Sequence, residues 1–175
     1  MSIRSTALAL ALLAGSAFSA FAGEQYVDSS GYAVSGFDVV AYFDIDQTQI
    51  GTPQKTAIRG KSAYTAEYNG AKWAFSTAEN RDKFAADPEK YAPQFDGHCA
   101  YGVAQGGKVS ANPNLWRIVD DKLFLNITKN VVTFWEEDIP GNISTATVNW
   151  NKLEAKGSAD NEIPQYDGPI GPVDQ

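Results

Sequence analysis

The chain has 175 residues, of which 21 are acidic and 14 are basic, so its formal net charge is −7 at neutral pH. An acidic chain without a block of lysines and arginines argues against a nucleic acid or an anionic membrane surface as the partner. The only cysteine, Cys99, cannot form a disulfide within the chain, and the only histidine, His98, excludes a metalloprotease motif with two histidines.

The first 22 residues predict a secretory signal peptide. Arg4 supplies the positive charge, the apolar core from Ala7 to Ala14 is too short to cross a bilayer, and Ala20–Ala22 forms an A-x-A cleavage site. We therefore expect cleavage before Gly23 and a periplasmic protein that leaves the membrane after cleavage. The alternative is an uncleaved membrane anchor.

A short apolar run, Phe37–Phe43, follows an extended lead-in over residues 23–35. Its β-branched and aromatic side chains predict a buried strand, and the polar stretch 44–60 predicts a surface loop. Aromatic residues then alternate on both sides of Asn69-Gly70, a dipeptide that suits both left-handed positions of a tight turn. This pattern predicts a first β-hairpin.

Capping signals predict the helices. Ser76 and Glu79 have the spacing of a capping box, which predicts a helix from Thr77 to about Ala86. Asp87-Pro88 predicts the start of a second, short helix. The remaining sequence again predicts a hairpin followed by helices. The elements are a second hairpin over 115–127 with its turn at 120–122, a helix over 128–137, and a helix after 140–141.

The order of these elements predicts a small α+β domain with two β-hairpins, a lead strand, and helices after each hairpin. We expect this domain to span residues 36–152. From about Gly157 the composition shifts to Asp, Pro, Gly and Asn, which predicts a flexible tail over residues 153–175. The sequence shows no internal repeat.

Three segments resemble the YHS domain family, and more narrowly its exported bacterial members: SGFDVVAYF, YNGAKWAFSTAENRDKFAADPEKYAPQFDGHCAYGVAQG and LWRIVDDKLFLN. The resemblance extends over residues 36–150 and is most specific in Tyr68–Pro93 and Gly97–Tyr101. It implies a small α+β fold and an association with the handling of heavy metals. In metal-ATPase and mercury-related relatives, YHS segments carry cysteines that are thought to bind the metal.

This sequence departs from those relatives at both cysteine positions. Ser76 stands where they have a cysteine just after the second strand of the hairpin, and GFDVVAYF replaces their opening element with a cysteine. Cys99 belongs to a different position. The departures weaken the inference of metal binding by analogy.

Cys99 and His98 are nevertheless the best candidate ligands, because thiolate and imidazole bind copper, zinc and iron. Two ligands are too few for zinc, so Asp38, Asp96 or Tyr101 would complete the set, or a homodimer would supply a second set. Neighbouring side chains diverge on a helix or a strand. Both can reach one ion only in a turn, which Asp96 and the following glycine favour. The resulting hypothesis is a copper or zinc site.

Two other roles for Cys99 stay open. It can be a buried apolar residue beside Ala100 and Val103, with His98 hydrogen-bonded to the preceding turn, or a reactive thiol that is glutathionylated or bridges a dimer. The sequence has no nucleophile elbow, P-loop or dinucleotide motif, which favours a protein that is not an enzyme. We expect a non-catalytic metal-binding protein. The alternatives are an interaction or small-ligand module with a structural cysteine, and a thiol redox sensor.

Overall fold

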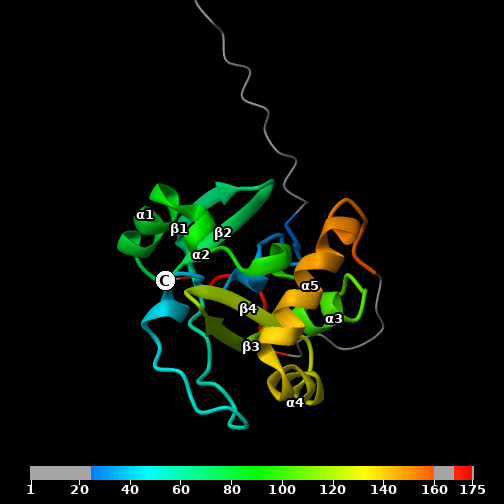
Figure 1. Cartoon of the computed structure of the whole chain (residues 1–175). Coiled ribbons are helices and arrows are strands. Elements are labelled where there is room, and N and C mark those ends of the chain that lie inside the picture. Colours follow the sequence, from blue (N-terminus) through cyan, green and yellow to red (C-terminus); the bar gives the residue numbers. More distant parts are fainter. Residues whose placement is uncertain (1–24, 160–167, 175) are drawn as a thin grey trace, which may run out of the picture.

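The computed structural model describes residues 25–159 and 168–174, so the expected signal peptide lies outside the described residues (Figure 1). Strands β1 (Lys61–Tyr68) and β2 (Ala71–Phe75) form one antiparallel hairpin, and β3 (Asn112–Val119) and β4 (Lys122–Asn126) form another. Helices follow each hairpin. The predicted α+β class is therefore confirmed.

The helices are short apart from the last one. Their bounds are α1 (Ala78–Ala86), α2 (Pro88–Tyr91), α3 (Ala100–Ala104), α4 (Lys129–Glu137) and α5 (Ile139–Leu153), with 3-10 segments η1 (Val34–Gly36), η2 (Ala41–Asp44) and η3 (Gln94–Gly97). Within the described ranges, no helix has both the length and the apolar character that crossing a bilayer requires. Sequence reasoning missed α3, whose five residues follow Cys99 directly.

Both hairpins close with two-residue turns in the left-handed region. Asn69 and Gly70 have φ angles of 49° and 71°, and Asp120 and Asp121 have φ angles of 48° and 57°. Asn, Asp and Gly tolerate this region best among the amino acids. The first turn is as predicted, whereas the second is one residue shorter than expected because Lys122 already belongs to β4.

The lead strand expected at Phe37–Phe43 does not form. Phe37 makes a single antiparallel bridge with Arg59, and the chain then enters η2. The cause is the side chain of Asp38, whose Oδ1 accepts hydrogen bonds from the backbone N–H groups of Val40 (3.0 Å) and Ala41 (3.2 Å). These donors are satisfied locally, which favours a turn over a strand.

The tail is partly fixed to the domain. The backbone N–H of Val173 donates to Gly60 O at 2.8 Å, and Ser62 N–H donates to Val173 O at 3.0 Å, so the segment 168–174 runs beside the start of β1. The Arg59 guanidinium also donates to Gly171 O. The end of the chain therefore adds to the edge of the first hairpin, where the sequence predicts a flexible tail.

The two hairpins are copies of one structural unit, a repeat that the sequence does not show. Lys61 pairs with Phe75 and Asn112 pairs with Asn126, and every other pair of the second hairpin also stands 51 positions after its counterpart in the first. Both hairpins carry a register shift at the same place. We call residues 34–91 the first unit and residues 95–153 the second unit.

The same spacing continues into the helices. Thr77 and Thr128 cap α1 and α4 through their side chains, and both helices have nine residues. The next residues, Asp87 and Asp138, have nearly identical backbone angles (φ −152° in both) and each begins a further helix. The repeat is hidden in the sequence because few side chains are shared.

One aromatic pair shows how the units differ in sequence and agree in packing. Trp73 and Phe84 meet at 4.9 Å between ring centroids with an interplanar angle of 37°. Their counterparts Phe124 and Trp135 meet at 5.6 Å with an angle of 38°. The large and the small aromatic side chains have changed places, which preserves the combined volume of the pair.

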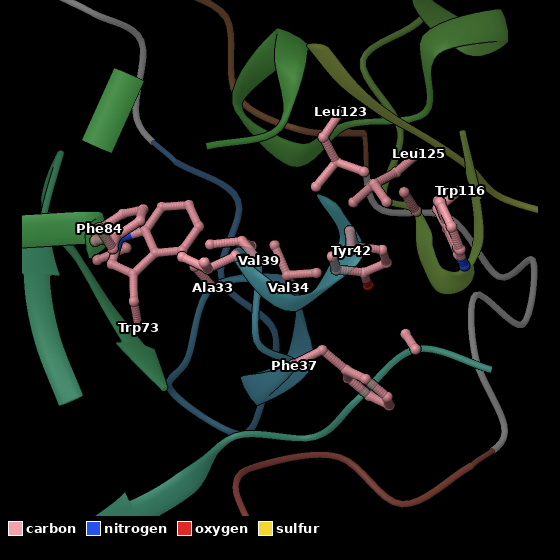
Figure 2. Close-up of a cluster of buried hydrophobic side chains, with 14 of the residues drawn as sticks. Ala33, Val34, Phe37, Val39, Tyr42, Trp73, Phe84, Trp116, Leu123 and Leu125 are labelled. Atoms are coloured by element: carbon pink, nitrogen blue, oxygen red, sulfur yellow. The ribbon is translucent and has the colours of Figure 1, made fainter. Parts of the chain in front are cut away.

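One hydrophobic cluster joins the two units. Figure 2 shows Trp73 of the first hairpin and Phe84 of α1 at one end, Trp116 and Leu125 of the second hairpin at the other, and Val39 between them. The turn segments η1 and η2 therefore lie between the hairpins and pack against both. Tyr42 stands edge-on to Trp116 at 5.3 Å between centroids, and its hydroxyl donates to Pro113 O.

Candidate functional site

His98 and Cys99 are consecutive and both are fully buried, yet their side chains enter different parts of the protein. The His98 ring lies against Tyr26 and Trp150. Cys99 lies in the main hydrophobic cluster between the hairpins. The backbone is extended at both residues, so the two side chains point to opposite sides, as on a strand.

Cys99 caps helix α3. Its Sγ accepts a hydrogen bond from Gly102 N–H at 3.3 Å and donates one to Asn126 Oδ1 at 3.5 Å. Burial raises the pKa of the thiol to about 11, although backbone N–H groups of Gly102, Ile127 and Tyr101 act in the opposite direction. At neutral pH the side chain is therefore a protonated thiol, whereas nucleophiles and soft-metal ligands are thiolates.

His98 holds a left-handed turn in place. Its Nδ1 lies 2.9 Å from Phe95 O, which can only accept, so Nδ1 carries the proton. Nε2 lies 2.5 Å from the hydroxyl of Ser158 and is the acceptor there. Burial lowers the pKa of His98 to about 4, so the ring is neutral at pH 7 and both nitrogens are already used.

Asp38 is a fully buried carboxylate with five hydrogen-bond donors. In addition to the two backbone donors on Oδ1, its Oδ2 accepts from Ser76 N–H (2.7 Å), the Ser76 hydroxyl (2.6 Å) and Asn80 Nδ2 (2.7 Å). These bonds fasten the turn at η2 to the start of α1. Ser76 therefore donates its hydrogen bonds to Asp38 and does not cap α1 as predicted. Thr77 is the N-cap of this helix.

The two segments in which this chain departs from its cysteine-bearing relatives meet at this point. The GFDVVAYF segment and Ser76 are joined by the Asp38–Ser76 hydrogen bonds. In this chain, the place is occupied by a carboxylate, a hydroxyl and an amide. No thiol lies there, because Cys99 is the only cysteine.

Cys99 is the counterpart of Asp38 in the second unit. Asp38 follows the left-handed turn Val34–Gly36, and Cys99 follows the left-handed turn Phe95–Gly97. The backbone N–H of Asp38 donates to Ile58 O and that of Cys99 donates to Val109 O, three residues before β1 and β3 respectively. Each side chain also accepts from the N–H group three residues ahead, Ala41 for Asp38 and Gly102 for Cys99, and Asp38 accepts in addition from Val40 and Ser76 N–H.

The other predicted ligands lie apart from the thiol. Tyr101 stacks on Phe134 at 5.9 Å between ring centroids, on the α3–α4 side. Asp96 faces a cavity near α5. Among residues 25–159 and 168–174, no three histidine, cysteine, aspartate or glutamate side chains form a group that could hold a metal ion.

The cavity beside Asp96 was not predicted from the sequence. It measures about 340 Å³ and is lined by residues of both units, among them Tyr68 and Glu89 of the first and Asp96 and Trp150 of the second. Asp96 Oδ2 is buried without a hydrogen-bond partner in the described part of the chain. Burial raises the pKa of Asp96 to about 6, with Glu154 adding to this effect and Lys108 opposing it.

His98 and Asp96 should affect stability in opposite directions as the pH changes. The pKa of His98 is lowered from 6.5 to about 4, so its contribution is lost as the pH falls through this window. The pKa of Asp96 is raised from 3.8 to about 6, so its contribution is lost as the pH rises through that window. The two slopes oppose each other between about pH 4 and pH 6.

The Asp96→Asn variant should therefore expose the His98 slope. Relative to wild type, its free energy of unfolding should fall more steeply as the pH drops from 6.5 to about 4, with up to about 3 kcal/mol arising from His98. His98→Gln should change the slope in the opposite direction. Urea unfolding across this pH range measures both, and pH-independent differences from wild type would contradict the assignment.

Residues 54–95 match the model of the YHS domain family. The match contains the first hairpin, α1 and α2, which confirms the resemblance over that segment, and almost all of the second unit lies outside it. This part of the chain is therefore similar to the YHS domain, a family associated with metal handling. No curated protein and no solved structure matches the chain.

Proposed function

We propose that the chain is an exported, non-catalytic binding protein of the YHS type in which Cys99 and His98 are structural residues. The observation that carries the proposal is that the polar atoms of both side chains are used inside the fold. The Cys99 thiol caps α3 and the two ring nitrogens of His98 bridge Phe95 and Ser158. The leader sequence at residues 1–22 supports export.

The protonation states of the two residues support the same proposal. A thiol with a pKa of about 11 is protonated at neutral pH, so it is a weak nucleophile, and a metal would have to displace its proton to bind. A neutral His98 whose Nε2 is taken by Ser158 lacks an open position for a metal. The ligand of the protein therefore has to be sought at another place on the molecule.

A copper or zinc site at Cys99 is the second candidate, and the YHS match favours it because the family is associated with metal handling. Such a site would need the thiol to lose its proton and exchange its contacts with Gly102 and Asn126 for the metal. A soft Cu(I) ion is the metal that best suits a thiolate.

The metal content of the untagged chain, expressed with copper or zinc in the medium and purified without chelators, separates the two candidates. We expect no stoichiometric metal in wild type, and a loss of about 1–2 kcal/mol in the free energy of unfolding for Cys99→Ser because a buried thiol is replaced. Near-stoichiometric metal that disappears in Cys99→Ser would overturn the proposal in favour of the metal site. A Ser110→Ala variant is a suitable control, because it also alters a buried polar side chain but leaves the thiol in place.

A further inference from the structure

We propose that the cavity beside Asp96 binds a small organic cation, such as an amine or a quaternary ammonium compound. This proposal rests on the proposed function and extends it by assigning the binding site and the chemical class of the ligand. The cavity of about 340 Å³ lies within the size range of small-molecule sites.

The position of the cavity follows from the repeat. The end of β1 at Tyr68 and the helix α2 residue Glu89 come from the first unit, whereas the left-handed turn at Phe95 and Asp96 and the helix residue Trp150 come from the second. A ligand there contacts both units. Interfaces between structural units are common places for ligand sites.

Two acidic residues, Asp96 and Glu89, line the cavity. Asp96 Oδ2 is buried and has no hydrogen-bond partner in the described residues, so nothing there compensates its charge through a bond. Glu89 is exposed to solvent. The pKa of Tyr68 is raised by burial and then by Glu89 and Asp96, which places both carboxylates near the phenol of Tyr68. A cation would offset the cost of the buried carboxylate.

Two lysines and one further acid also face this region. Lys108 opposes the rise in the Asp96 pKa, but its ammonium donates to the carbonyl groups of Glu154 and Lys156 at 2.7 Å each. The Glu154 carboxylate raises the Asp96 pKa. Lys122 also lines the cavity but is exposed, so water screens its charge. Asp96 therefore keeps its preference for an added positive charge.

Aromatic walls favour an organic cation over a metal ion. Tyr68, Phe95 and Trp150 line the cavity, and Phe95 and Trp150 lie 5.6 Å apart between ring centroids. Aromatic ring faces attract ammonium groups, as the Lys108 ammonium 5.1 Å from the Trp150 ring centroid shows, whereas metal ions prefer oxygen, nitrogen or sulfur ligands. The described residues also contain no group of three carboxylate, histidine or cysteine side chains for a metal.

Choline and its neutral carbon analogue 3,3-dimethyl-1-butanol provide the test, because they have the same shape and differ in charge. Calorimetric or NMR titration of the wild-type chain should show choline binding at least about tenfold more tightly than the neutral analogue. Asp96→Asn should weaken choline binding about tenfold or more and leave the analogue unchanged. Asparagine tolerates the left-handed backbone at this position, where φ is 50°.

Asp82→Asn is the matched control, because it removes the same charge from an exposed position on α1 that does not line the cavity. It should bind choline as wild type does. The proposal is overturned if neither choline nor tetramethylammonium binds, if the neutral analogue binds as well as choline, or if Asp96→Asn and wild type bind alike. Binding of Ca²⁺ or Mg²⁺ without choline, lost in Asp96→Asn, would also overturn it in favour of a metal site.

These outcomes are distinct from the test of the proposed function. The choline titration can fail while wild type holds no metal and Cys99→Ser loses only stability, in which case the binding protein needs another ligand. Metal retained through Cys99 would instead overturn the proposed function. Thermal unfolding of Asp96→Asn at neutral pH shows whether the variant is folded in the titration.

Discussion

Asp38→Ala should lower the free energy of unfolding by more than about 3 kcal/mol, because it leaves five donors without their acceptor in the protein interior. The loss should be cooperative, since the same carboxylate holds η2 and the start of α1. Urea unfolding with an unchanged m-value measures it.

Two milder variants serve as controls for Asp38. Ser76→Ala removes one of the five donors and should cost about 1–2 kcal/mol. Asp38→Asn keeps the Oδ1 acceptor but turns an amide toward Ser76 and Asn80, so its effect should fall between the other two. A loss below about 1 kcal/mol for Asp38→Ala would show that water replaces the carboxylate and that the network contributes little.

Cys99→Asp should be the most damaging substitution at the position equivalent to Asp38, with a loss of about 3–5 kcal/mol. Of the backbone donors of the first unit, only one has a matching hydrogen bond here, from Gly102 N–H to the thiol. The side-chain donors Ser76 and Asn80 have the apolar counterparts Ile127 and Val131. The new carboxylate would also face the Oδ1 atom of Asn126, which now accepts from the thiol. Chemical unfolding measures the loss.

The Cys99 series includes its own controls. Cys99→Ser keeps a donor and an acceptor and should be mildest, and Cys99→Ala should be intermediate because it leaves Gly102 N–H without its acceptor. Adding Val131→Asn to Cys99→Asp should recover part of the loss, since it restores the counterpart of the Asn80 amide, and a double-mutant cycle isolates that term. If Cys99→Asp were as stable as Cys99→Ser, the two positions would tolerate charge equally.

Most of the fold could be predicted from the sequence because its signals are local. The Asn69-Gly70 turn, the Asp87-Pro88 helix start and the alternation of aromatic residues in the hairpins depend only on neighbouring residues. The errors have the same origin. A capping box at Ser76 and a strand at Phe37–Phe43 are good local predictions that a distant contact overrides, because Asp38 binds Ser76 from 38 positions away.

The repeat and the site could not be predicted for a related reason. Val34 and Phe95 adopt left-handed backbone angles that neither a β-branched nor an aromatic side chain favours, so no residue preference signals the two equivalent turns. The predicted ligands are Cys99, His98, Asp38, Asp96 and Tyr101. In the structure, the side chains of Cys99, His98 and Asp38 form hydrogen bonds inside the protein. Asn80, Asn126 and Ser158, which complete these contacts, carry no motif.

The cluster shared by the two hairpins also determines how the chain unfolds. Trp73 and Phe84 contribute to the same buried group as Trp116 and Leu125, and the turns between the hairpins belong to both. Removing one unit would expose apolar surface on the other. The chain should therefore unfold in a single two-state transition, with coincident fluorescence and circular dichroism curves, and neither half should fold alone. Although the two units have the same order of strands and helices, together they form one cooperative domain.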